Sequence, residues 1–162
     1  SDMRVVGLVR NVLQATRFDP YFLTLEITET ARISDHEVAA TILNELRSIG
    51  VRISMDDFGV GAANYEAFYE LPFDEIKIDR MFVANIAKDP KARAIVASIA
   101  AMGRGARITV VAEGLENPQD IPMLQEAGCQ QVQGFAFSRP LSLSNLLEYQ
   151  ELAPEQTLSN IV

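Results

Sequence analysis

The sequence predicts an α/β fold in which helices cover a parallel sheet. Segments of strand type and of helix type alternate along the 162 residues, and five strand segments are visible. A helix comes first, with no strand before it. A complete (β/α) barrel has eight strands and about 250 residues. The chain is therefore either an open parallel sheet or a TIM-like barrel that is incomplete at its N-terminal side, and the leading helix favours the barrel.

The first elements follow from hydrophobic spacing and from helix start and stop signals. Valine and leucine recur at helical spacing over residues 3–16, which predicts an amphipathic helix. Leu23–Glu29 alternates apolar and polar residues, a pattern typical of a strand. Ser34 and Glu37 form a capping box that predicts the start of the next helix, and Gly50 predicts its end.

The same cycle repeats through the rest of the chain. The predicted elements are a strand over Arg52–Asp56, a helix over Asn64–Glu70, a strand over Glu75–Ile78, helical segments across Met81–Ala106, a strand over Ile108–Ala112, a helix from Asn117 to Gly128, a strand over Gln131–Gln133 and a helix capped by Ser142. Residues from 153 onward are polar and weakly patterned. We therefore expect a partial domain over residues 1–152 and a polar tail over residues 153–162.

Composition and charge exclude several classes of protein. Hydrophobic residues make up 48% of the chain, which fits a globular domain and excludes a disordered one. The 22 acidic residues outnumber the 14 basic ones, and the net charge of −8 argues against binding to a nucleic-acid polymer or to an anionic membrane. No apolar run approaches the length of a bilayer span, so we expect no direct membrane contact from this segment.

The single histidine and the single cysteine predict no site of their own. His36 falls in the first turn of a predicted helix, where we expect a solvated surface side chain. Cys129 has no partner for an internal disulfide, so a reducing cytoplasmic location is the default expectation.

Polar side chains follow each predicted strand at its C-terminal end, where βα folds build their active sites. They are Glu26 and Glu29, Asp56 and Asp57, Lys77 and Asp79, Glu113 and Glu116, and Gln133. Carboxylates that converge repel one another unless a cation neutralises them. Oxygen ligands of this kind suit Mg²⁺, Mn²⁺ or Ca²⁺, and two such ions can clamp a phosphodiester during in-line displacement. The pattern predicts a metal-dependent hydrolase acting on a phosphate ester.

Five segments carry a family resemblance. They are Leu25-Glu-Ile-Thr-Glu29, Met55-Asp-Asp-Phe-Gly59, Ile76-Lys-Ile-Asp79, Val111-Ala-Glu-Gly-Leu-Glu116 and Gln133-Gly-Phe-Ala-Phe-Ser-Arg-Pro140. In this order and spacing they resemble the successive motifs of EAL domains, the bacterial cyclic di-GMP phosphodiesterases. The resemblance implies a TIM-like barrel that uses two Mg²⁺ or Mn²⁺ ions to hydrolyse cyclic di-GMP to linear pGpG.

The resemblance also implies roles for single residues. Glu26 and Asp56 would bind metal, Asp57 would bridge or bind the second ion, and Glu113 would complete the metal shell. Lys77 would contact the attacking water, and its other interpretation is a cation that only balances the acids. The remaining matched residues would support metal, water, substrate or the nearby loop; they are Glu29, Asp79, Glu116, Gln133 and Arg139.

Two departures from the family pattern stand out. The glutamate of the family's first strand and the asparagine of its next strand, both metal ligands, have no counterpart here, so we expect them before Ser1. The family's usual threonine after Asp-Asp-Phe-Gly is Val60 in this chain. A hydrogen bond lost there would cost about 1 kcal/mol of loop ordering.

Two main functions therefore remain open, beside a third, a Mg²⁺-dependent barrel that acts on some other phosphate ester. The first is a phosphodiesterase. In that case we expect little or no turnover from this chain alone, and we expect a version extended upstream to be active. The second is a non-catalytic module that binds cyclic di-GMP or a protein partner. The resemblance and the exposed strand edges of an opened barrel both imply a homodimer.

Overall fold

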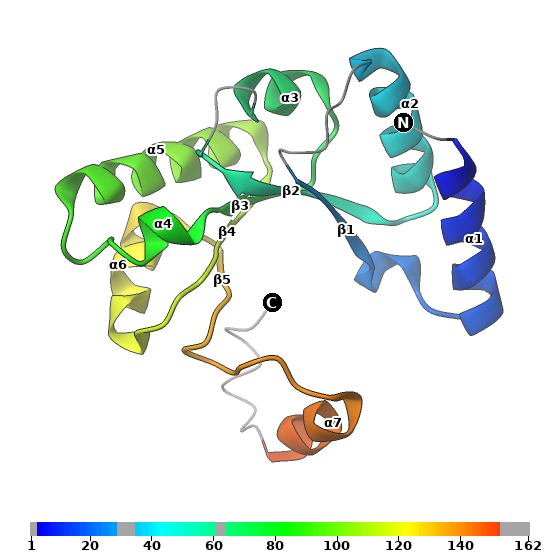
Figure 1. Cartoon of the computed structure of the whole chain (residues 1–162). Coiled ribbons are helices and arrows are strands. Elements are labelled where there is room, and N and C mark those ends of the chain that lie inside the picture. The colour runs from blue at the N-terminus through cyan, green and yellow to red at the C-terminus, as the bar shows by residue number, and fades with distance from the viewer. Residues whose placement is uncertain (1–2, 29–34, 61–63, 153–162) are drawn as a thin grey trace. The chain divides into compact units, whose positions relative to one another are not determined.

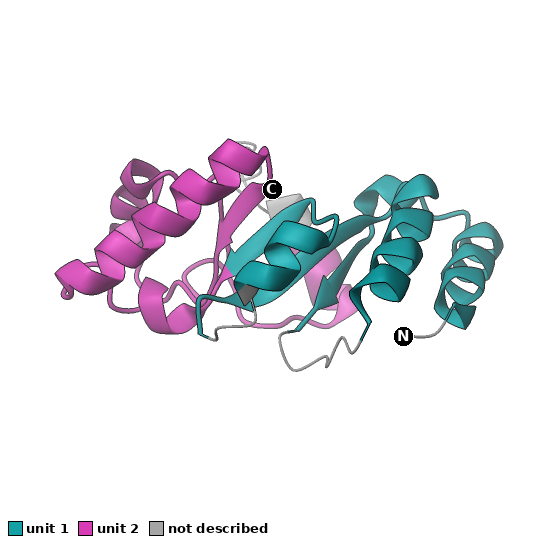
Figure 2. Cartoon of the chain, turned by 90° about the horizontal axis from the view of Figure 1, so that it is seen from above, with its two compact units in different colours: residues 1–77 teal, residues 78–162 magenta. Residues whose placement is uncertain are grey.

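Strands and helices alternate in the computed structural model, which describes residues 3–28, 35–60 and 64–152. The strands follow chain order across an open parallel sheet; they are β1 (Thr24–Ile27), β2 (Arg52–Phe58), β3 (Glu75–Ile78), β4 (Thr109–Ala112) and β5 (Gln131–Val132). This confirms the predicted fold class. The chain divides into two compact units, residues 1–77 and residues 78–162, which Figure 2 colours teal and magenta.

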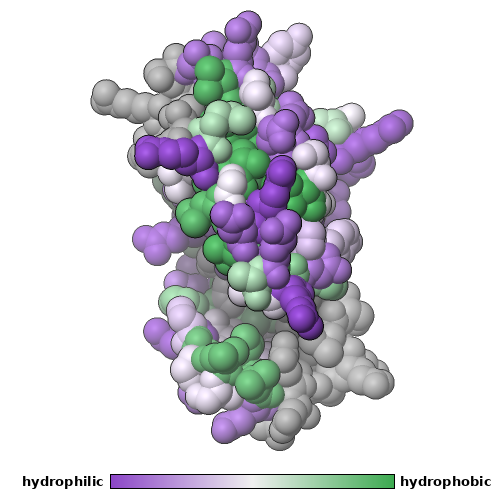
Figure 3. Space-filling view, turned by 90° about the vertical axis from the view of Figure 1, so that its right-hand side faces the viewer, coloured by the Kyte–Doolittle hydropathy of each residue, from purple (hydrophilic) through white to green (hydrophobic). Residues whose placement is uncertain are grey.

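In the first unit, two helices pack side by side (Figure 1). Helix α1 (Arg4–Thr16) buries only Val6 and Leu13, while α2 (His36–Ser48) buries four apolar residues at helical spacing. Helix α2 contacts both α1 and β2, so it covers the sheet and α1 covers α2. The outer face of α1 leaves Leu8 and Val12 exposed, and hydrophobic and hydrophilic side chains are intermixed on the face that Figure 3 shows.

Strands β2 and β3 form the centre of this unit. Ile53 and Phe58 of β2 have no exposed surface, and every residue of β3 is buried. Burial on both faces explains why β3 is apolar on either side of Lys77. In the parallel pair of β1 and β2, Glu26 lies opposite Ser54. A 3₁₀ turn, Pro20–Phe22, leads into β1, and helix α3 (Asn64–Glu70) follows β2 and contacts α2.

In the second unit, α5 (Pro90–Ala106) packs against α4 (Arg80–Val83), β4 and α6 (Ile121–Ala127). Two elements begin directly after a capping side chain: Asp89 caps α5 just before Pro90, and Asn117 caps the 3₁₀ turn Pro118–Asp120. Strand β5 pairs with β4 in parallel, and helix α7 (Leu143–Leu152) comes last.

Several predicted boundaries need correction. Asp35 caps α2 by accepting a hydrogen bond from the Val38 N–H, so the expected Ser34–Glu37 capping box is wrong; Ser34 itself lies outside the described residues. Strand β2 continues two residues beyond Asp56. The helical segments predicted across residues 81–106 are α4 and α5, and Pro90 occupies the first turn of α5, where its missing N–H costs nothing.

His36 lies in the first turn of α2, as predicted, and it is partly rather than fully solvated. Its side chain is 28% exposed and contacts Glu70 of α3, because the first turn of α2 lies against that helix. The predicted tail, residues 153–162, and Glu29 lie outside the described residues. Among the described helices, none combines the length and apolar character that crossing a membrane requires.

Candidate active site

Lys77 links two of the predicted acids in the first unit. Its Nζ lies 2.6 Å from Oε1 of Glu26 and 3.7 Å from Oδ1 of Asp56. The lysine side chain is 5% exposed, whereas the Glu26 side chain is 47% exposed. A buried ammonium group is stable only when carboxylates compensate it. The three side chains, from β3, β1 and β2, therefore form one charged cluster, as the strand-end pattern predicts.

Asp57 has an unusual backbone for a strand residue. Its φ is +54°, which places it in the left-handed region, and its N–H donates to Oδ1 of Asp56 at 3.0 Å. In a regular strand, neighbouring side chains point to opposite faces. The left-handed turn interrupts that alternation at the end of β2, next to Gly59, which has φ +106°. Aspartate tolerates this conformation better than most residues.

The charged residues of the first unit fit a divalent metal of the hard type. Glu26, Asp56 and Asp57 offer carboxylate oxygens only, the ligands that Mg²⁺, Mn²⁺ and Ca²⁺ prefer. The Lys77 ammonium lies between Glu26 and Asp56, so carboxylates already compensate one positive charge at this position. The oxygen ligands of this unit are therefore compatible with a divalent cation.

In the second unit, the segments around Glu113 and Gln133 are joined by backbone hydrogen bonds. The Gln133 N–H donates to the Ala112 carbonyl at 2.8 Å, and the Leu115 N–H donates to the Gln133 carbonyl at 3.1 Å. The Glu113 N–H donates to the Ile78 carbonyl at 3.2 Å, which joins the end of β4 to the end of β3. Two motifs that are 20 residues apart are therefore held at the same edge of this unit.

Two glycines, which the sequence pattern did not single out, allow close approaches in this unit: Gly134 against Leu115, between the two motifs, and Gly114 against Arg80 of α4. A Cβ on Gly134 would lie 2.2 Å from the Leu115 carbonyl oxygen, and a Cβ on Gly114 would lie 2.4 Å from Cβ of Arg80. Gly114 also has φ +71°. Both glycines lie inside the motifs quoted above. Their positions within these motifs were therefore the sequence signal that could have identified them as close-approach sites.

The other predicted residues of this unit are spread over its loops. Asp79 accepts a hydrogen bond from the Met81 N–H at 2.6 Å and so caps α4. The Arg139 guanidinium lies 5.0 Å from the centre of the Phe135 ring, a cation–π contact. Glu113 is half-buried, and Glu116 and Gln133 are exposed.

Comparison with known proteins decides the family. The family model described as "EAL domain" matches residues 1–140. The chain belongs to the EAL-domain family. Among curated relatives of this EAL domain, the cyclic di-GMP phosphodiesterase NbdA of Pseudomonas aeruginosa is 39% identical over 145 residues, which cover 90% of the chain and 18% of NbdA. The EAL domain thus spans about a fifth of that relative.

Solved structures agree with the fold. The structure titled "PaMucR Phosphodiesterase, c-di-GMP complex" has a TM-score of 0.79 and 39% identity, and the match covers 87% of this EAL domain and 57% of that chain. MucR is a protein of Pseudomonas aeruginosa. The manganese and cyclic di-GMP complex of Klebsiella pneumoniae BlrP1 has a TM-score of 0.76 and 36% identity, with coverage of 83% and 34%. These structures confirm the predicted relation to EAL barrels.

Proposed function

We propose that this EAL domain serves a phosphodiesterase that hydrolyses cyclic di-GMP to pGpG. The observation that carries the proposal is the buried Lys77 in contact with Glu26 and Asp56, three residues that occupy the positions of the family motifs. Relatives named as cyclic di-GMP phosphodiesterases, at 30–39% identity, support the choice of substrate.

The proposed cofactor is a pair of Mg²⁺ or Mn²⁺ ions. Glu26, Asp56, Asp57 and Glu113 would hold them, and the manganese complex of BlrP1 supports a divalent cation. Such ions, when bound, lower the pKa of a coordinated water and take up charge on the phosphodiester.

The chain's own residues supply position and charge in this proposal. Lys77, freed from one of its acids, would donate a hydrogen bond to the attacking water or to the phosphate oxygen as negative charge develops. Glu116, Gln133 and Arg139 would contact metal, water or substrate from the loops of the second unit. Glu29 would steady the loop after Asp57, and Asp79 would support Lys77 by ending β3 with the cap of α4.

Formation of pGpG from cyclic di-GMP tests the proposal. It is measured with Mg²⁺ and with Mn²⁺, on the 162-residue chain and, if the parent protein is longer, on that protein. We expect turnover in the longer form that a matched Asp56→Asn variant loses. Turnover that survives this substitution, or none in any form, would overturn the enzymatic proposal.

Binding without turnover would favour the second candidate, a cyclic di-GMP-binding or protein-interaction module. We also propose a cytoplasmic homodimer. Strand β1 lies at the edge of the sheet, and α3 exposes Tyr65 and Tyr69, so unpaired backbone and aromatic surface are both available to a second copy. Light scattering coupled to gel filtration tests it, and a monomer over the micromolar range would contradict it.

A further inference from the structure

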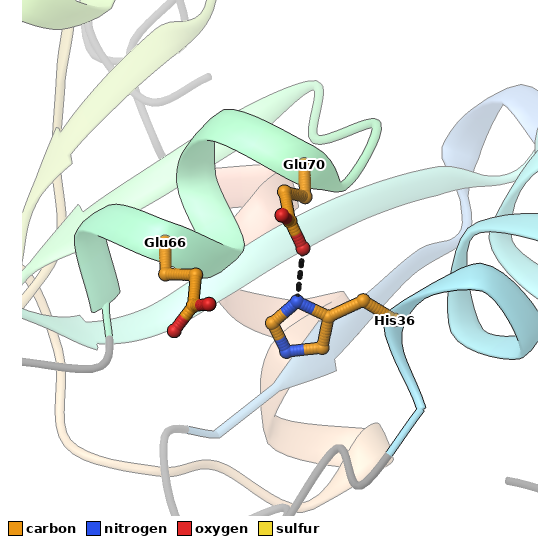
Figure 4. A group of neighbouring side chains, drawn as sticks. All are labelled: His36, Glu66 and Glu70. Carbon is orange, nitrogen blue, oxygen red and sulfur yellow. Dashed lines mark hydrogen bonds and ion pairs between the residues drawn. The ribbon is translucent and has the colours of Figure 1, made fainter.

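Three potential metal ligands meet on the surface of the first unit, and none of them belongs to the strand-end cluster of Lys77, Glu26 and Asp56. His36 is the first residue of α2, and Glu66 and Glu70 lie one turn apart on α3 (Figure 4). The Asp35 cap fixes the first turn of α2, and α2 contacts α3, so the imidazole is directed at the two carboxylates. Nδ1 of His36 contacts Oε2 of Glu70.

The spacing of these groups suits a single ion. One ligand atom from each residue lies within 4.8 Å of the other two. Around Zn²⁺, bonds of about 2.0–2.2 Å place neighbouring tetrahedral ligands roughly 3.3–3.6 Å apart. The side chains of His36 and Glu70 are 28% and 42% exposed, so small rotations can close the remaining distance.

The charges favour a cation at this position. Glu66 and Glu70 are four residues apart on one helix, an arrangement in which like charges repel. The chain already carries a net charge of −8. One ion bound by both carboxylates would remove this repulsion and would join α2 to α3.

The ligand types select a different metal from that of the strand-end cluster. One imidazole nitrogen and two carboxylates suit Zn²⁺ and other transition-metal ions, whereas Mg²⁺ prefers oxygen ligands alone. We propose that His36, Glu66 and Glu70 bind one divalent transition-metal ion, Zn²⁺ in the first place, separately from the catalytic cluster. The proposal does not depend on the phosphodiesterase activity.

The competing interpretation is a plain ion pair between His36 and Glu70. In that case Glu66 takes no part in the contact, and the chain has no specific Zn²⁺ site at these residues. The substitution Glu66→Gln therefore separates the two interpretations, because it removes a metal ligand and leaves the His36–Glu70 contact intact.

The single histidine makes the test specific. The metal-free chain is titrated with Zn²⁺ in the presence of millimolar Mg²⁺, and the ring nitrogens of His36 are followed by proton–nitrogen correlation spectra. We expect the ring signals to shift and to saturate near one equivalent, and a calorimetric titration to report micromolar or tighter binding. Glu66→Gln should weaken the affinity at least tenfold, and His36→Gln should abolish this binding step.

Glu45→Gln is the matched control, because Glu45 is an exposed glutamate of α2 outside the cluster. Its Zn²⁺ affinity should equal that of the unaltered chain. Far-ultraviolet circular dichroism reports whether each variant folds. If Glu66→Gln does not fold, Glu70→Gln serves as the second ligand variant. Unshifted ring signals, or an affinity that neither ligand substitution lowers, would overturn the proposal.

Discussion

The Nζ atom of Lys77 lies 2.6 Å from Oε1 of Glu26, and the two residues are 51 positions apart in the sequence. The lysine is buried and the glutamate is exposed, so the pair connects the interior of the sheet to its open edge. Because β1 and β3 lie on either side of β2, this contact also encloses Asp56 at the end of β2.

Replacement of Lys77 should reduce hydrolysis more than folding stability. We expect Lys77→Met to lower kcat by about 100- to 1,000-fold, the usual cost of removing one charge-stabilising donor. Stability should fall less than activity, because methionine fills the same space, the exposed Glu26 can return to water, and Asp56 loses only a contact of 3.7 Å. Turnover is measured in the form that hydrolyses cyclic di-GMP, with exposed Lys88→Met as the control. Equal loss in both variants would contradict a specific role.

The left-handed backbone at Asp57 should distinguish two substitutions. Asp57→Asn keeps a residue that tolerates φ +54°, whereas Asp57→Ala adds roughly 1 kcal/mol of backbone strain. Both should lose activity, because each removes a proposed metal ligand. Urea unfolding should therefore find the alanine variant less stable than the asparagine variant. Equal midpoints would show that the backbone at Asp57 is not strained.

The contact between the two late motifs depends on Gly134. A methyl group there would lie 2.2–2.3 Å from the backbone of Leu115, so Gly134→Ala should destabilise the chain severely or prevent folding. Gly105→Ala in α5 is the matched control, since nothing lies within 4 Å of its added methyl. That substitution should stabilise the helix by about 0.5–1 kcal/mol. Thermal unfolding of both variants measures the contrast.

Cys129 should make stability depend on pH above neutrality. Burial of the thiol raises the pKa of Cys129 to about 11. In the unfolded chain a cysteine ionises near pH 8.5. The preference for the neutral thiol therefore stabilises the fold fully below that value, and this contribution is lost as the pH rises toward about 11.

Lysines and tyrosines also ionise in this pH range. The contribution of Cys129 is therefore measured as the difference in stability between the unaltered chain and a variant without the thiol. Urea unfolding of the unaltered chain and of Cys129→Ala is compared from pH 7 to pH 10.5, and only the unaltered chain should show the additional loss. Parallel slopes would mean that Cys129 is not buried as a neutral thiol. Alkylation by iodoacetamide at pH 8 should also be much slower in the folded chain than in urea.

The order of strands and helices could be predicted because it depends on local signals. The predicted bounds of α3 and β3 agree with the structure to the residue, and Gly128 marked the end of α6. The N-cap of α2 could not be predicted in the same way. Serine and aspartate, the residue types at positions 34 and 35, are both good N-caps, and the backbone conformation determines which position becomes the cap.

The sequence by itself determined the fold class, the family and the acids at the strand ends, since motif and periodicity are properties of neighbouring residues. Only the tertiary structure decided which charges meet. The contact of Lys77 with Glu26, the fit of Gly134 against Leu115, and the meeting of His36 with Glu70 each join residues at least 19 positions apart. Such contacts depend on strand pairing and helix packing, and no local pattern specifies them.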